Sequence, residues 1–136
     1  MNLNPQTSIR EHSVFLEKFE DGSVYYAAKI QWPENAKNSL AWAESQNHQR
    51  PLVERYLQFN GYSTRLQLVS GLSKLEAKLI KANLIKNCIL QKKKNLNILK
   101  ETSIELSSHH VLNIQSYCEC SYNRAKELVE IFNSLK

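Results

Sequence analysis

The sequence predicts a small α/β protein: a sheet of about three strands with flanking helices, followed by a pair of helices at the C-terminal end. Three observations lead to this fold class. Two alternating apolar runs surround a turn signal within residues 13–27, a capping box opens a helical pattern at Ser73, and two further helical patterns fill residues 107–135. At 136 residues, 42% of them hydrophobic, the chain suffices for one domain with a modest core.

The strands are predicted from alternation and turn residues. The runs within residues 13–27 flank an Asp-Gly pair at residues 21–22, which is a strong short-range signal for a β-hairpin. A short helix is expected at residues 36–44, after a turn at residues 32–35.

The clearest helical signal follows the third strand. Ser73 and Glu76 form a capping box, in which each side chain can bind the backbone N–H of the other. Ala77, Ile80 and Leu84 then continue as an apolar stripe at helical spacing. The sequence therefore predicts a helix that begins directly after Ser73.

Two helices joined by a short turn are predicted at the C-terminal end. Residues 107–118 can form a capped helix, Glu119 and Cys120 a turn, and Ser121 can cap a helix over residues 122–135. The apolar stripe of the second helix consists of Ala125, Leu128, Val129 and Phe132. This pattern is typical of a helix-turn-helix, whose second helix enters the DNA major groove, and equally of a helical hairpin that closes a core.

In a helix-turn-helix, the side chains at the start of the second helix would face the bases. These candidate base contacts are Ser121, Tyr122, Asn123, Arg124 and Lys126. Asparagine and arginine can make bidentate contacts with adenine and guanine edges, respectively. Because Asn123 and Arg124 lie off the apolar stripe, we expect their replacement to leave the stability of the fold nearly unchanged.

Positive charge is concentrated in one fifth of the chain. Residues 74–100 contain eight lysines and one glutamate, whereas the whole chain has a net charge of +5. The candidate contacts to a DNA backbone are Lys74, Lys78, Lys81, Lys92, Lys93 and Lys94. The first three share one face of the predicted helix, and the last three follow on its exit loop. Such a strip suits a phosphate backbone, although lysine runs also occur as plain solvated surface.

Several short segments occur in an order known from one family of nucleases. Ser-Val-Phe at residues 13–15 and Tyr-Tyr-Ala at residues 25–27 flank the hairpin turn, residues 51–62 contain a glycine near their end and precede Arg-Leu-Gln-Leu-Val at residues 65–69, and Asn-Leu-Asn-Ile follows at residues 95–98. With the capped helix between residues 69 and 95, these segments resemble the GIY-YIG nucleases, whose first two motifs are Gly-Ile-Tyr and Tyr-Ile-Gly. The resemblance implies a helix within residues 51–62, which ends at the glycine, and a third strand at residues 65–69. The resemblance covers roughly residues 12–100 and leaves no motif intact.

The resemblance implies that the nuclease active site has degenerated. In the family, tyrosine hydroxyls, an arginine and a metal-binding glutamate share the work of hydrolysis. Here Phe15 lacks the first hydroxyl, Tyr25 stands at the second motif, Lys37 falls near the arginine position, and Lys81 replaces the glutamate. A lysine ammonium has no lone pair with which to bind Mg²⁺ at neutral pH. We therefore expect no cleavage, no bound metal and no cofactor.

Together these features favour a protein that binds double-stranded DNA without cutting it. A binder that occupies its site would block polymerase, so we expect a sequence-specific repressor of phage or mobile-element type, derived from a homing endonuclease. We expect a polar arm over residues 1–11, the nuclease-like domain over residues 12–100, and the DNA-binding helices over residues 101–136. No signal peptide or membrane span is predicted, so the expected location is the cytoplasm of a bacterial host. A homodimer is left open.

Two alternatives stay open at this point. In the first, the chain is an active metal-dependent nuclease in a different alignment, with Glu76, Tyr25, Tyr26 and Arg55 as its functional residues. In the second, it is a protein-interaction module that inhibits a host or phage factor. Metal-dependent cleavage of a plasmid would indicate the first alternative, and a lack of salt-dependent DNA binding would indicate the second.

Overall fold

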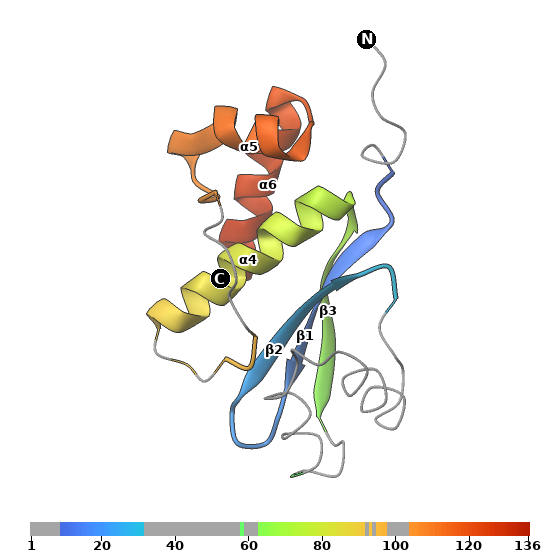
Figure 1. Cartoon of the computed structure of the whole chain (residues 1–136), viewed down its shortest axis with the longest axis vertical. Coiled ribbons are helices and arrows are strands. Elements are labelled where there is room, and N and C mark those ends of the chain that lie inside the picture. Colours follow the sequence, from blue (N-terminus) through green and yellow to red (C-terminus); the bar gives the residue numbers. More distant parts are fainter. Residues whose placement is uncertain (1–8, 32–57, 59–62, 92, 94, 98–103) are drawn as a thin grey trace.

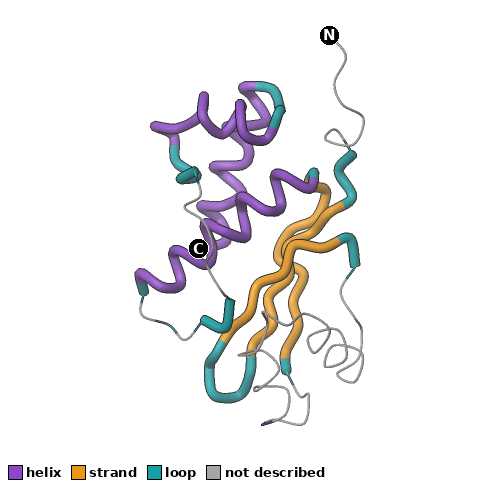
Figure 2. The backbone as a smooth tube through the Cα atoms, in the orientation of Figure 1, coloured by secondary structure: helices purple, strands orange, loops and turns teal. Residues whose placement is uncertain are grey.

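The computed structural model describes residues 9–31, 58, 63–91, 93, 95–97 and 104–136 (Figure 1). Within these residues the protein has one antiparallel three-stranded sheet and three α-helices, and Figure 2 shows the helices grouped on one side of the strands. This confirms the predicted α/β class. The helix expected at residues 36–44 and nearly all of the segment at residues 51–62 lie outside the described residues.

The sheet begins with the predicted hairpin. β1 (His12–Lys18) pairs with β2 (Val24–Lys29) on one side and with β3 (Thr64–Leu72) on the other, which gives the strand order β2-β1-β3. The connection between β1 and β2 contains Gly22 in the left-handed region, with a φ of 86°, where glycine pays no steric penalty. The hairpin is therefore confirmed, and the third strand extends beyond the predicted residues 65–69.

α4 (Lys74–Leu90) begins as the capping box predicts. The Ser73 hydroxyl accepts a hydrogen bond from the Glu76 amide, and the Glu76 carboxylate accepts one from the Ser73 amide. Ala77, Ile80 and Leu84 are all buried where α4 packs against the sheet. The predicted start and the predicted apolar stripe are both confirmed.

The C-terminal helices differ from the prediction only at their beginning. Residues 108–110 form a single 3₁₀ turn, η1 (Ser108–His110), before α5 (Val111–Cys118). The Ser107 hydroxyl is 2.6 Å from Nδ1 of His110 and therefore does not cap a helix. α6 (Tyr122–Leu135) has the predicted bounds, and Ser121 is its N-cap.

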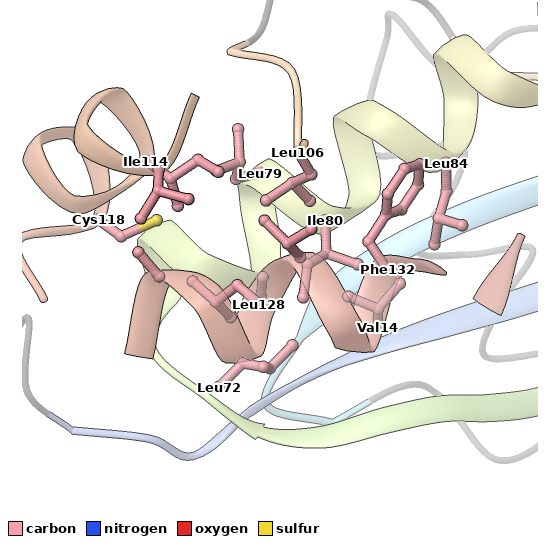
Figure 3. Close-up of a cluster of buried hydrophobic side chains, with 14 residues drawn as sticks. Val14, Leu72, Leu79, Ile80, Leu84, Leu106, Ile114, Cys118, Leu128 and Phe132 are labelled. Carbon is pink, nitrogen blue, oxygen red and sulfur yellow. The ribbon is translucent and has the colours of Figure 1, made fainter. Parts of the chain in front are cut away.

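One apolar core joins the sheet to all three α-helices (Figure 3). Its fully or nearly fully buried side chains include Val14, Leu72, Ile80, Leu84, Leu106, Ile114, Leu128 and Phe132. Each aliphatic side chain that is fully buried stabilises the fold by about 1.5–3 kcal/mol relative to an exposed one. The α5–α6 pair thus closes the core of the α/β layer. This packing is the helical hairpin that the sequence offers as one of its two interpretations of these helices.

A buried asparagine fixes the chain that leads into α5. The Asn83 side chain of α4 donates hydrogen bonds to the Leu79 and Ile104 carbonyls, and its oxygen accepts one from the Leu106 amide. An unpaired buried amide would cost free energy, so these contacts hold the chain in one place. Leu106 is thereby positioned for the core.

A buried ion pair connects the first turns of α4 and α6. Arg124 reaches both carboxylate oxygens of Glu76, with Nε 3.0 Å from Oε2 and Nη2 3.0 Å from Oε1. Its Nη2 also donates to the Gly71 carbonyl at the end of β3, at 3.0 Å. The Glu76 side chain is 1% exposed and that of Arg124 is 15% exposed. Arg10 lies beside the same carboxylate, with Nε 3.5 Å from Oε1.

This ion pair corrects a prediction about stability. The sequence predicts that Arg124 can be replaced at little cost because it lies off the apolar stripe of α6, and this is wrong. Its partner lies 48 residues earlier in the chain, in a different helix. Helical periodicity reports only which face of a helix is apolar, so it contains no signal for a polar contact of this kind.

Glu76 has a lowered pKa. Burial alone would raise it, but hydrogen bonds from Arg124 and Ser73 and the charges of Arg124 and Arg10 outweigh burial and hold the pKa below its ordinary value of 4.5. The carboxylate is therefore ionised in the native protein at neutral pH.

We expect Arg124→Met to lower the free energy of unfolding by about 3 kcal/mol, because it leaves a buried carboxylate without its main partner. Lys126→Met is the matched control. It removes the same charge from the same helix, but Lys126 is exposed, so its loss should stay below about 1 kcal/mol. Urea denaturation of both variants measures the difference. Equal small losses would show that the ion pair contributes little.

The lowered pKa of Glu76 predicts how stability depends on pH. A carboxylate with a lowered native-state pKa stabilises the fold above its unfolded-state pKa, and this contribution is lost as the pH falls through the native-state value. The difference in unfolding free energy between wild type and Glu76→Gln should therefore be constant from about pH 7 to about pH 5.5 and shrink below about pH 4.5. A difference that stays constant down to about pH 3 would contradict this assignment.

Candidate nucleic-acid interface

The basic strip lies along the exposed side of α4. Lys74 and Lys78 are exposed, and Lys81 follows on the same helical face and is half-buried. The spacing therefore places the three ammonium groups along one line, as predicted. Within the described part of the chain, none of these three lysines forms an ion pair.

The exit loop continues the strip beyond the helix. Lys93 is exposed just after the C-terminal end of α4, while Lys92 and Lys94 lie outside the described residues. Because α4 has 17 residues, it is about 25 Å long at 1.5 Å per residue. Lys74 and Lys93 therefore mark the two ends of the strip.

Hydrogen bonds hold this loop on the outer edge of β2. The Leu96 amide donates to the Val24 carbonyl at 2.8 Å. The Asn97 side chain imitates a neighbouring strand: its oxygen accepts from the Tyr26 amide at 2.7 Å, and its nitrogen donates to the Tyr26 carbonyl at 2.8 Å. Such pairing satisfies backbone groups at the edge of a sheet.

Lys81 is the centre of a group of three positive charges. It lies where α4 packs against β2, and the charges of Lys29 at the end of that strand and of Lys78 one turn earlier in the helix act on it. Burial, and then the charges of Lys29 and Lys78, lower the pKa of Lys81 from its ordinary value of 10.5. We call Lys29, Lys78 and Lys81 the Lys81 cluster. A half-buried cation with like-charged neighbours costs free energy, which a bound anion would offset.

The start of α6 exposes four of the five predicted base contacts. Those four are Ser121, Tyr122, Asn123 and Lys126. Nζ of Lys126 lies 5.7 Å from the centroid of the Tyr122 ring, within the range of a cation–π interaction. The fifth, Arg124, is directed into the protein, where it binds Glu76 and, at 3.1 Å, Glu127. Its donors are therefore engaged within the fold.

The sheet separates Lys81 from the other described positions that were matched to the nuclease active site. Phe15 of β1 pairs with Ala27 of β2. Tyr25 lies two residues before Ala27 in the same strand, so Phe15 and Tyr25 lie on one face of the sheet. The next residue, Tyr26, packs against the core on the helix side, which places Lys81 and Tyr25 on opposite faces. Lys37 lies outside the described residues.

Sequence reasoning missed a polar cluster on the sheet face away from the helices. Glu17 is 2% exposed and accepts hydrogen bonds from the Ser63 hydroxyl at 2.6 Å and from Nε of Arg65 at 2.9 Å. Burial, and then the neighbouring Glu17 charge, raise the pKa of Tyr25, so this phenol is protonated at neutral pH. The signal for this cluster that the sequence offered was a charged residue, Glu17, inside an alternating strand.

In the alternative nuclease alignment, the carboxylate and the two tyrosines have perturbed or engaged side chains. Both carboxylate oxygens of Glu76 are bound by Arg124. Burial and Cys88 raise the pKa of Tyr26, as burial raises that of Tyr25. Arg55 lies outside the described residues.

The comparisons with known proteins do not identify a family for this chain. The sequence matches no protein-family model, and neither curated proteins nor solved structures gave a match. The interpretation of the chain therefore rests on its own residues. In the part of the chain that the structure describes, no helix has the length and apolar character needed to cross a bilayer.

The free-energy cost of the Lys81 cluster predicts that removing a lysine from it stabilises the fold. Replacing Lys81 with Met removes a half-buried charge, so we expect the free energy of unfolding to rise by about 0.5–1 kcal/mol at neutral pH. Because the native-state pKa is lowered, the cost in the wild type should decrease as the pH rises above that value and disappear near the ordinary pKa of 10.5. Lys74→Met, at an exposed position, should have no stabilising effect. A loss of stability in Lys81→Met would show that the ammonium has a stabilising partner.

Proposed function

We propose that the protein binds double-stranded DNA through phosphate contacts from α4 and does not cut it. The observation that supports this most is the Lys81 cluster. Lys81 is half-buried, and the positive charges of Lys29 and Lys78 act on it. No carboxylate of the described residues pairs with Lys78 or Lys81. An arrangement that costs stability at the surface is typical of a binding site, because its ligand supplies the missing charge.

The length of the strip supports a polymer rather than a small anion. Lys74 and Lys78 are exposed in the first turns of α4, and Lys93 is exposed just beyond the other end of this helix, which is about 25 Å long. Duplex DNA offers one negative charge for about every 1.7 Å of its axis, so several phosphates can face a helix of this length. Contacts of this kind set affinity and orientation but contain no base information.

The absence of cleavage is proposed from the chemistry of the same residues. Lys81 stands where the resemblance would place a metal-binding glutamate, and an ammonium group repels a divalent cation. Glu76, the carboxylate nearest in sequence, has both oxygens bound by Arg124. The proposal is that a nuclease-like scaffold uses this lysine for a phosphate instead of a metal.

Sequence specificity is proposed to reside in the first turn of α6. Tyr122, Asn123 and Lys126 are exposed there, and an asparagine side chain can bind adenine through two hydrogen bonds. Glu127 and Glu130 are exposed further along the helix and would repel phosphates. Only the start of α6 is therefore suited to contact DNA. A protein that binds a site in this way without cutting it would act as a repressor.

The salt dependence of DNA binding tests this proposal. Each lost phosphate contact should reduce the slope of log K against log salt by about 0.9. We expect this reduction for Lys78→Met and for Lys81→Met, measured by fluorescence anisotropy on one duplex over a salt series. Lys18→Met is the control, since Lys18 is exposed at the end of β1 and should leave the slope unchanged. Identical slopes for all variants would show that α4 does not contact phosphates.

Supercoiled plasmid incubated with the protein and Mg²⁺ tests the second half of the proposal. We expect the plasmid to stay uncut. Metal-dependent nicking that is lost in Glu76→Gln would instead establish the active-nuclease alternative.

A further inference from the structure

The exposed side of α5 forms one continuous helical face. Val111, Ile114 and Cys118 are buried in the core on the inner side of this helix, and the exposed positions between them recur at the same helical spacing on the opposite side. Figure 1 shows α4 and α6 between α5 and the strands. We call the exposed side chains of this helix the α5 face; they are Leu112, Asn113, Ser116 and Tyr117.

The α5 face carries no charge. It belongs to the longest stretch of the chain without Asp, Glu, Lys or Arg, which covers residues 106–118, although these four residue types make up 23% of the sequence. Leu112 is nevertheless 72% exposed and Tyr117 is 39% exposed. A surface that binds a phosphate backbone or a partner of opposite charge needs charged side chains. The α5 face is therefore unsuited to either.

We propose that two copies of this chain associate through the α5 face, with their α5 helices packed against each other across a two-fold axis. In such a contact the same surface patch meets itself, so charged side chains near the axis would face their own kind. Each copy has a net charge of +5, and two copies therefore repel each other through their lysine-rich surfaces. The uncharged face is where they can approach with the least repulsion.

The polar groups of the α5 face can also pair with copies of themselves. Lysine and arginine only donate hydrogen bonds, and ionised carboxylates only accept them, whereas the side chains of Asn113 and Ser116 do both. Two identical faces can therefore satisfy each other's hydrogen bonds around an apolar contact made by Leu112. A partner of different composition would not require this self-complementary set.

The size of the α5 face predicts a weak dimer. The helix has eight residues and is about 12 Å long, so one face of it buries much less than the roughly 800 Å² per partner of a standard stable interface. We expect a dissociation constant on the order of 100 μM. Self-association should therefore depend on concentration in the range where the free chain can be studied.

Sedimentation equilibrium of the full chain without DNA, from about 10 μM to about 1 mM, tests this inference. The wild type should follow a monomer–dimer equilibrium. Leu112→Asp brings two carboxylates together across the axis and should weaken association at least about tenfold. Leu90→Asp is the matched control, because Leu90 is 76% exposed at the end of α4, and it should associate like the wild type. Urea denaturation of both variants checks that they are folded.

A mixture of two variants tests the two-fold arrangement itself. Leu112→Lys should also fail to associate alone, but an equal mixture of Leu112→Asp and Leu112→Lys should associate, because opposite charges then face each other. A mixture that stays monomeric would overturn the arrangement. A wild type that is monomeric at about 1 mM, or an equal loss in Leu90→Asp and Leu112→Asp, would overturn the use of the α5 face. Since no DNA is present, none of these failures affects the proposed function.

Discussion

The buried ion pair between Glu76 and Arg124 is the contact on which the arrangement of the helices depends. The same carboxylate closes the capping box of α4, and the same guanidinium binds the carbonyl of Gly71, so one pair fixes the end of β3 and the beginnings of α4 and α6. A buried carboxylate is stable only with such partners. Lys74 and Lys78 each stand two residues from Glu76, about 200° around the helix. The ion pair therefore determines which side of α4 carries its lysines outward.

α4 thus contains polar groups with opposite energetic effects. Glu76 is buried and fully paired, and its lowered pKa reflects the net stabilisation of its charge. Lys81 is half-buried beside other lysines, and its lowered pKa reflects a destabilised charge. Both pKa values are lowered. For the acid Glu76 this means that the charged form is stabilised, whereas for the base Lys81 it means that the charged form is destabilised. In the proposed function, the stability supplied by the ion pair and the core compensates for a cluster that the fold alone does not require.

Local features of the fold could be predicted from the sequence, and contacts between distant residues could not. The glycine of the hairpin turn, the capping box at Ser73 and the apolar stripe of α6 are signals within a few residues, and all three proved correct. The partner of Arg124 and the approach of Lys29 to Lys81 depend on how separate elements pack. The six-lysine strip was predicted as a line of charges, and only the packing of α4 on β2 shows that one of them is half-buried.

The most direct test of the account is a titration of ¹⁵N-labelled protein with a short duplex, followed by two-dimensional NMR. If the α4 surface is the interface, the resonances that shift should belong to Lys74, Lys78 and Lys81 and to the end of β2 at Lys29. Arg65, on the opposite face of the sheet, should not respond. Shifts confined to α5 and α6, or no shifts at all, would contradict the claim that α4 binds the phosphate backbone.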